Sequence, residues 1–416
     1  MSEMSYLEKL LDGVEVEWKA VGDIAGYSTT KVDADKLDAT SFVGVDNLLA
    51  DKGGRIDATY QPNTARLTAY EPGDLLLGNI RPYLKKVWMA ENNGGCSGDV
   101  LAIRILADCK KIISPEYLYY ALSSDSFFSY SMQHAKGAKM PRGSKDAILN
   151  YQIPIPCPSA PGKSLAIQSE IVRILDKFTA LTAELTAELT MRKKQYNYYR
   201  DQLLSFEEGD VEWKTLGEIS RKISSGGTPK TGVTEYYDGT IPWLRTQEVD
   251  FREIWDTEIK ITEEGLKTSS AKWIPKDCII IAMYGATVGK IGINKIPMTT
   301  NQACANIQLD EEIVHYRYVF HFLCSQYAYI KSLGTGSQTN INAQIVKNIK
   351  IPVPFAENPE KSLNEQLRIV NILDKFDTLT SSITEGLPRE IELRQKQYEY
   401  YRDLLFSFPR PETASN

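Results

Sequence analysis

The sequence predicts an α+β protein with two globular, mixed α/β units separated by two long, antiparallel, coiled-coil-like helices. Three observations support this prediction. Blocks of sequence recur in the same order in the two halves, which indicates an internal repeat. Each copy carries a long amphipathic stripe, and short apolar runs bounded by turn residues fill the rest. With 416 residues, 42% of them apolar or aromatic, the chain can form two or three domains.

Matched blocks define the repeat. VEWKAVGDI (16–24) matches VEWKTLGEI (211–219), and IPIPCP (153–158) matches IPVPFA (351–356). ILDKF followed by KKQYNYYRD in the first copy matches ILDKF followed by QKQYEYYRD in the second. Because all blocks keep their order, coincidence is a poor explanation, and the two halves should share one fold.

The start of the sequence resembles the end of a further copy. SYLEKLL (5–11) is followed by VEW, as YYRDQLL is later. A chain that begins and ends within the repeat can close on itself, so we predict a circular, pseudo-two-fold organisation. The predicted segments are an N-terminal helical segment completing the repeat (1–13), a first globular unit (14–157), a central helical spacer (158–207), a second globular unit (208–356) and a distal helical spacer (357–416).

The helical spacers are predicted from apolar residues that recur every three or four positions. Gly386-Leu387-Pro388 in the second spacer predicts a kink or break there. The two stripes should pack on each other in antiparallel fashion. The residues assigned to these spacer and partner-docking helices are Ile171, Phe178, Leu185, Leu189, Tyr199, Ile369, Phe376, Ile383 and Tyr401.

Composition excludes several classes of protein. No apolar run approaches the roughly 20 residues of a membrane helix, and no secretory signal is visible at the start. The six cysteines form no CxxC pair, which predicts reduced thiols in a cytoplasmic protein and no structural zinc site. A net charge of −6 excludes a generally basic, histone-like mode of DNA binding but allows local basic surfaces.

Catalytic and metal-binding motifs are missing. Gly285-Ala-Thr-Val-Gly289-Lys290 resembles a phosphate-binding loop, but the spacing is short and Ile291 replaces Ser/Thr, so a β-turn is the better interpretation. His134, His315 and His321 lack metal-ligand spacing; the latter two are predicted to be packed or surface residues. The sequence therefore predicts no catalytic residue, no metal site and no cofactor bound by this chain.

Binding chemistry remains. Loops in both halves combine basic residues with amides, hydroxyls and aromatic rings, the groups that contact phosphates and base edges. For each loop alone, a solvated surface is the simpler interpretation, but their recurrence at comparable positions favours DNA contact. The candidate DNA-binding residues are Arg81, Lys85, Lys86, Lys136, Lys139, Arg142, Lys145, Thr228, Lys230, Arg245, Thr246, Gln247, Tyr284, Lys290, Gln338 and Asn340.

These features resemble a known family. GGTPKTGVTEYYDGTIPWLRTQEV (226–249), IIIAMYGATVGKIGI (279–293) and GTGSQTNINAQIVKNIKIPVP (334–354) are similar to the specificity subunits of type I restriction–modification enzymes. The start MSYLEKLLDGVEVEW and the TAEL tandem (182–189) most resemble the type IC group. The first half departs from the pattern, since GYSTTK (26–31) lacks the TP motif and IPW is absent.

The resemblance implies two target-recognition domains, each reading one half of a bipartite, asymmetric site in double-stranded DNA. It implies that the helices set the spacer and dock two copies of a methylation subunit, and that restriction subunits join them. S-adenosylmethionine, ATP and Mg²⁺ would then bind to the partner subunits. The alternatives are a self-contained DNA methyltransferase or nucleotide-hydrolysing enzyme, and a coiled-coil protein scaffold. Missing cofactor motifs disfavour the enzyme, and the paired basic loops disfavour the scaffold.

Overall fold

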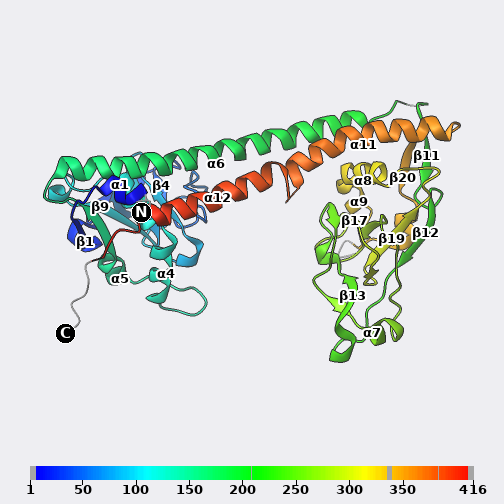
Figure 1. Cartoon of the computed structure of the whole chain (residues 1–416), viewed down its shortest axis with the longest axis horizontal. Coiled ribbons are helices and arrows are strands. Elements are labelled where there is room, and N and C mark those ends of the chain that lie inside the picture. Colours follow the sequence, from blue (N-terminus) through cyan, green and yellow to red (C-terminus); the bar gives the residue numbers. More distant parts are fainter. Residues whose placement is uncertain (1–5, 208, 335–339, 383, 411–416) are drawn as a thin grey trace, which may run out of the picture. The chain divides into compact units, whose positions relative to one another are not determined.

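The computed structural model describes residues 6–207, 209–334, 340–382 and 384–410. The chain divides into two units (Figure 1). Unit 1 comprises Met1–Glu184 with Glu392–Asn416, and unit 2 comprises Leu185–Ile391. No helix among the described residues has the length and apolarity needed to cross a bilayer.

Unit 1 is built around two four-stranded sheets. The first has the order β2-β9-β6-β7, from strands Ala25–Tyr27, Val100–Ile105, Leu75–Gly78 and Val87–Met89. The second has the order β3-β5-β8-β4, from Lys31–Asp33, Arg66–Tyr70, Gly94–Cys96 and Phe42–Val43. Short helices follow: α2 (Val21–Ile24), α3 (Pro115–Leu122), α4 (Asp125–Gln133) and α5 (Lys145–Asn150). Serine side chains cap α3, α4 and α5, which explains where each helix begins.

Unit 2 has a five-stranded and a three-stranded sheet. The larger has the order β12-β19-β16-β17-β14, from Ser220–Ser225, Cys304–Leu309, Ile279–Ala282, Ile291–Asn294 and Arg252–Ile254. The smaller has the order β15-β13-β18, from Lys260–Ile261, Tyr237–Leu244 and Thr299–Thr300. Its helices are α7 (Glu263–Lys267), α8 (Tyr316–Ser325), α9 (Tyr327–Ser332) and α10 (Ala343–Lys347). The central strands β16 and β17 are buried throughout, as their Ile-rich sequences require.

The two copies of the repeat share strand register and individual hydrogen bonds. In unit 1, β1 (Val16–Ala20) pairs antiparallel with β10 (Gln152–Pro156); in unit 2, β11 (Val211–Thr215) pairs with β20 (Lys350–Pro354) in the same register. The hydroxyl of Tyr117 donates to the carbonyl of Pro154 at 2.8 Å, and that of Tyr318 donates to Pro352 at 2.9 Å. The predicted α+β fold with its internal repeat is confirmed.

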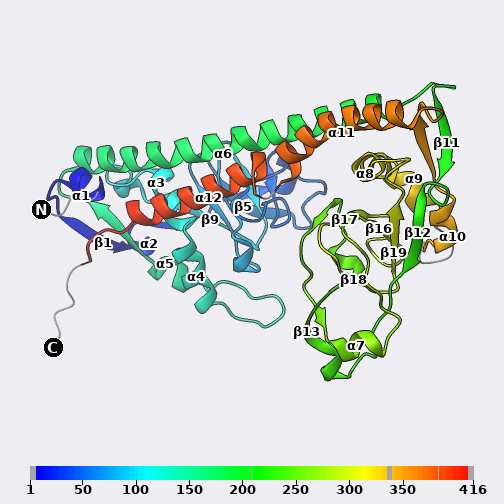
Figure 2. The same ribbon diagram turned by 45° about the vertical axis from the view of Figure 1, so that its right-hand side comes forward.

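Three long helices carry the stripes: α6 (Pro161–Leu203), α11 (Pro359–Ser381) and α12 (Gly386–Leu405). Within unit 1, α12 lies beside α6 in both views (Figures 1 and 2), and Phe178 stacks on Tyr401 with ring centroids 5.3 Å apart. Within unit 2, Tyr199 of α6 stacks on Phe376 of α11 at 5.5 Å. Ile171 and Ile369 are fully buried, whereas Leu185 and Leu189 are half-buried; Ile383 lies outside the described residues.

The predicted break in the second spacer is confirmed. α11 ends at Ser381 and α12 begins at Gly386. Gly386 has φ +78, and a Cβ there would lie 2.4 Å from the carbonyl oxygen of Thr378, so a residue with a side chain would be strained at this turn. Pro388 then sits in the first turn of α12, where a missing N–H does no harm.

Residues from both ends of the sequence close the core of unit 1. Helix α1 (Tyr6–Leu11) buries Leu7 and Leu11 in the same cluster as Leu405 and Phe408. In unit 2 the end of α6 plays the corresponding part, because Leu203, Leu204 and Phe206 pack on that core. This is the circular organisation that the partial copy at residues 5–11 predicted.

Candidate nucleic-acid interface

In unit 1 two basic segments meet at one end of the first sheet. The turn between β6 and β7 (79–86) makes two backbone hydrogen bonds with the loop between α4 and α5. Gly143 N–H donates to the carbonyl of Asn79 at 3.0 Å, and Arg81 N–H donates to that of Pro141 at 2.7 Å. The structure therefore brings Arg81 and the Lys136–Lys145 loop together, although they are far apart in the sequence.

The loop between α4 and α5 is a hairpin closed by backbone hydrogen bonds. Lys136 and Arg142 exchange backbone hydrogen bonds of 2.9 and 2.8 Å, and residues 137–141 project beyond them (Figure 2). Gly137 at φ +103 permits the turn. Lys139 and Met140 at the tip are exposed. A projecting, basic, two-stranded element of this kind has the width that the major groove of DNA admits.

Unit 2 has the equivalent arrangement. The turn between β16 and β17 (283–290) is tied to the segment before α10, because Ile341 N–H donates to the carbonyl of Met283 at 3.0 Å. In each unit a third segment joins: Asn79 N–H donates to the carbonyl of Asp99, and Met283 N–H donates to that of Ala303, both at 2.8 Å. The predicted DNA-binding loops thus occupy matched places in the two units.

The unit 1 candidates differ in how free they are. Arg81, Lys136, Lys139 and Lys145 are exposed. Lys85 pairs with Asp125 at 2.7 Å, and the Lys86 ammonium donates to the carbonyl of Val45 at 2.7 Å. Arg142 lies 2.8 Å from the carboxylate of Asp99, which comes from outside the basic run 136–145. The sequence run conceals this contact because Asp99 comes from the turn before β9.

Three of the unit 2 candidates are held by protein partners. The Thr228 hydroxyl donates to Gln302; Arg245 pairs with Glu258 at 2.9 Å; Lys290 pairs with Asp250 at 2.6 Å. Lys230 and Gln247 are exposed, Tyr284 is 39% exposed, and Thr246 is buried. Gln338 lies outside the described residues. Asn340 is half-buried, and its Oδ1 has no hydrogen-bond partner among the residues that the structure places.

Two groups at these surfaces were not found from the sequence: Asp99, and the Asn301–Gln302 pair between β18 and β19. The available signal was position, since Asp99 directly precedes β9 and Asn301–Gln302 lie one residue before β19. Gly226 has a steric role, because a Cβ there would lie 1.9 Å from the carbonyl oxygen of Thr300. The GG pair therefore lets the start of the TP motif pack against β18.

One carboxylate organises the basic turn of unit 1. Asp125 at the start of α4 lies 3.4 Å from Lys52, 2.7 Å from Lys85 and 3.2 Å from Arg402 of α12. Burial alone would raise the pKa of Asp125, but the hydrogen bond from Lys85 and the charges of Lys52 and Arg402 lower it well below its usual range. Asp125 therefore stays ionised and fixes the β6–β7 turn to α12.

Unit 2 joins α8 and β14 to α11 through a charged network. Arg317 of α8 lies 2.7 Å from Asp374, 2.6 Å from Glu253 and 3.4 Å from Asp377. His321, fully buried, lies 2.7 Å from Asp374 and 3.2 Å from the Tyr196 hydroxyl. His321 was predicted to be a packed or a surface residue, and it is packed. In unit 1 the matching contact is neutral on one side: the Tyr120 hydroxyl donates to Asp176 at 2.6 Å.

The sequence that resembles a phosphate-binding loop is a β-hairpin turn. Residues 284–290 connect the antiparallel strands β16 and β17, and Gly289 N–H donates back to the carbonyl of Ala282. Among the described residues, no group of three or more His, Cys, Asp or Glu side chains is arranged to hold a metal ion.

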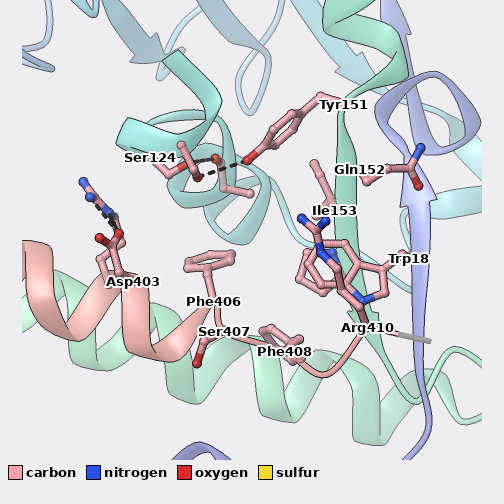
Figure 3. A pocket seen from close by; sticks show the side chains of 14 residues that line it. Trp18, Ser124, Tyr151, Gln152, Ile153, Asp403, Phe406, Ser407, Phe408 and Arg410 are labelled. Atoms are coloured by element: carbon pink, nitrogen blue, oxygen red, sulfur yellow. Dashed lines mark hydrogen bonds and ion pairs between the residues drawn. The ribbon is translucent and has the colours of Figure 1, made fainter. Parts of the chain in front are cut away.

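A cavity of about 310 Å³ lies in unit 1, where the segment after α12 packs on β1 and β10. Figure 3 shows Trp18 beside Arg410, with Phe406 and Phe408 to their left and the side chains of Ser124 and Tyr151 above. Trp18 donates its indole N–H to the carbonyl of Pro409 at 3.0 Å. The cavity is therefore a seam between the circularly joined parts of one unit, not part of the paired loop surface.

Comparison with known proteins places these surfaces in context. The model of the type I restriction modification DNA specificity domain matches residues 90–191 and 208–393. The chain is 46% identical, over all of both proteins, to the specificity subunit of the type I restriction enzymes EcoR124I/EcoR124II of Escherichia coli. It is 32% identical to a putative type I restriction enzyme specificity subunit of Haemophilus influenzae, covering 97% of this chain and 98% of the relative.

Solved structures agree in fold. A chain from a study of assembly and conformational transition of a type I R-M system matches with a TM-score of 0.57 at 18% identity, covering 94% of this chain and 97% of that one. The S subunit of the type I restriction-modification system of M. genitalium matches with a TM-score of 0.56 at 15% identity, covering 98% and 100%.

Proposed function

The chain belongs to the family of type I restriction–modification specificity subunits, and from this premise we propose that it is the non-catalytic DNA-recognition subunit of such an enzyme. It assembles with the other subunits and with DNA. Unit 1 and unit 2 each read one half of a bipartite, asymmetric site in double-stranded DNA. The long helices set the distance between the half-sites and dock two copies of a methylation subunit, and restriction subunits complete the complex.

One observation carries this proposal: both units build the same surface from three segments, but with different side chains. The ties from Gly143 to Asn79 and from Ile341 to Met283 hold equivalent loops at equivalent turns. Unit 1 offers lysines and arginines there, whereas unit 2 offers Tyr284, Gln302 and Asn340. Equal frames with different contact groups are what recognition of two unlike half-sites requires.

The cofactors belong, in this proposal, to the partner subunits. S-adenosylmethionine serves the methylation subunits, and ATP with Mg²⁺ serves the restriction subunits. The support is that the chain has no cofactor fingerprint, and that its one glycine-lysine sequence of that type forms a hairpin turn. The complex would work in the cytoplasm, where the DNA that it modifies lies.

The direct test is DNA binding by the chain assembled with its methylation subunit. The assembled complex should bind duplexes that carry one bipartite sequence at least 10³-fold more tightly than random duplexes of the same length, the lower end of the range for specific DNA-binding proteins. Sequencing of methylated sites should return a motif with two specified halves and an unspecified spacer. Equal affinity for all duplexes would contradict the proposal. Binding of labelled S-adenosylmethionine or ATP by the isolated chain would instead support a self-contained enzyme.

A further inference from the structure

Two matched positions of these surfaces carry side chains of different chemistry in the two units. In unit 1, Arg142 precedes the residue whose N–H donates to the β6–β7 turn; in unit 2, Asn340 precedes the equivalent donor. The carbonyl that accepts from the turn belongs to Asp99 in unit 1 and to Ala303 in unit 2. An Arg–Asp pair in one unit therefore replaces an Asn–Ala pair in the other.

Asp99 forms an ion pair with Arg142. Its carboxylate lies 2.8 Å from Arg142 Nη1, while 58% of the Arg142 side chain stays exposed. The backbone beneath is also fixed, because Arg142 exchanges two hydrogen bonds with Lys136 and Asp99 accepts one from Asn79. A guanidinium is a planar fork of donors, so holding one nitrogen sets the direction of the others.

The charge of the pair separates two possible uses of Arg142. Phosphate contacts depend on net positive charge and release of counterions. Asp99 cancels the charge of Arg142, so the pair attracts phosphate weakly. Its remaining N–H donors keep their hydrogen-bonding capacity and suit the O6 and N7 acceptors of guanine, the base edge that arginine contacts in pairs of hydrogen bonds. Exposed Lys139 at the loop tip forms no ion pair with the residues that the structure describes, so it suits phosphate.

Asn340 offers the other code. An asparagine amide donates to N7 of adenine and accepts from its N6 amine. Asn340 is half-buried, and its Oδ1 is covered and has no hydrogen-bond partner among the described residues, so the amide must rotate about its side-chain torsions before it can accept from a base. No charged neighbour is needed to orient a neutral amide, which agrees with Ala303 in place of Asp99.

We propose that Arg142, positioned by Asp99, reads a guanine in the half-site of unit 1, and that Asn340 reads an adenine in the half-site of unit 2. The inference rests on the proposed function and adds the specificity-determining residues and the bases that they read.

The test uses the chain assembled with its methylation subunit, with sites mapped by sequencing and affinities measured on duplexes changed one base pair at a time. Arg142→Lys keeps the charge but loses the fork; it should reduce discrimination at one guanine of one half-site roughly 10- to 100-fold and leave the other positions unchanged. Asn340→Ala should do the same at one adenine of the other half-site. The double variant Asp99→Ala with Arg142→Asn copies the unit 2 pair and should shift the preference from guanine towards adenine.

Two controls frame the result. Arg221→Lys alters an exposed Arg–Asp pair, 3.1 Å from Asp310, at the opposite end of the unit 2 sheet, and should change no base preference. Lys139→Ala should weaken all duplexes alike. Melting temperatures of the variants should match the unaltered chain. Arg142 variants that keep every base preference, or that weaken all duplexes alike, would overturn the assignment while the proposed function stands. If the unaltered complex shows no sequence preference, the proposed function itself fails.

Discussion

Gln168 and Gln366 make the same hydrogen bonds in the two units. Gln168 of α6 accepts from Ser114 N–H at 3.0 Å and donates to the carbonyl of Ile112 at 2.6 Å. Gln366 of α11 accepts from His315 N–H at 2.8 Å and donates to the carbonyl of Ile313 at 3.1 Å. Both glutamines are fully buried. Each one ties the start of the helix that follows the last sheet strand to a spacer helix, so that sheet and spacer form one body.

Replacing Gln366 by Ala should destabilise unit 2. The substitution leaves a part-buried N–H and a part-buried carbonyl without partners, at about 1–3 kcal/mol each, so we expect a loss of roughly 2–6 kcal/mol in the free energy of unfolding. Urea unfolding followed by tryptophan fluorescence measures it. Gln344→Ala, an exposed glutamine of α10, is the matched control and should change stability by less than about 0.5 kcal/mol. A similar effect of both variants would show that the glutamine contact contributes nothing particular.

Unit 2 should depend on pH through Asp374. Burial alone would raise the pKa of Asp374, but the hydrogen bond from His321 and the charge of Arg317 lower it below its ordinary value of 3.8. A carboxyl whose pKa is lower in the folded state adds stability above its unfolded pKa and loses it as pH falls through the folded value. The melting temperature should therefore decrease as the pH is lowered below about 4. Asp374→Asn should be less stable at pH 7 and lose less on acidification; parallel pH profiles would rule out this role.

The tip of the unit 1 hairpin should contribute one phosphate contact. Lys139→Ala removes an exposed cation, so the slope of log affinity against log salt concentration should flatten by roughly 0.9. Titration of the assembled complex between about 50 and 200 mM salt measures the slope. The control is Lys163→Ala, which removes an exposed cation at the start of α6. An unchanged slope for Lys139→Ala would mean that the tip faces solvent or another subunit.

The TAEL tandem should set the spacer of the DNA site. Thr182–Leu185 and Thr186–Leu189 lie within α6, and Leu185 and Leu189 are half-buried. Deleting Thr186–Leu189 removes about 6 Å and a little over one turn, which nearly preserves the buried face. At 3.4 Å per base pair, the unspecified spacer should shorten by about one or two base pairs while both half-sites persist. Mapping of methylated sites decides it: full activity with an unchanged spacer would show that the tandem does not set this distance.

The two units should be separable in specificity. Replacing Val14–Ile155 by the matching segment of a relative should change the bases of one half-site only, because the contact loops of unit 1 all lie within this segment. The methylated motif of the hybrid gives the answer. Changes in both half-sites would contradict independent reading by the two units.

The repeat made the architecture predictable, because two copies of one pattern constrain each other. The break at Gly386 also followed from sequence, since glycine and proline act locally. Long-range pairs could not be predicted in this way. Asp99 lies beside Arg142 only because the turn at Asn79 joins their two segments. The two glutamines are polar residues, so their sequence did not indicate that they are buried. The shared spacing in SLAIQ (164–168) and SLNEQ (362–366) was the one available indication of that clamp.

The core of unit 1 has a consequence for how the protein is made. Leu7 and Leu11 share that core with Leu405 and Phe408, whereas the core of unit 2 draws on one uninterrupted stretch of chain. During synthesis, which runs from the N-terminus, unit 2 can fold while unit 1 still lacks the last wall of its interior. A product cut short before residue 405 would expose apolar surface in unit 1 and become a target for chaperones and proteases. Because unit 1 includes residues from α12, it can complete its core only after α12 has been synthesised, and a truncated chain would leave this unit unfinished.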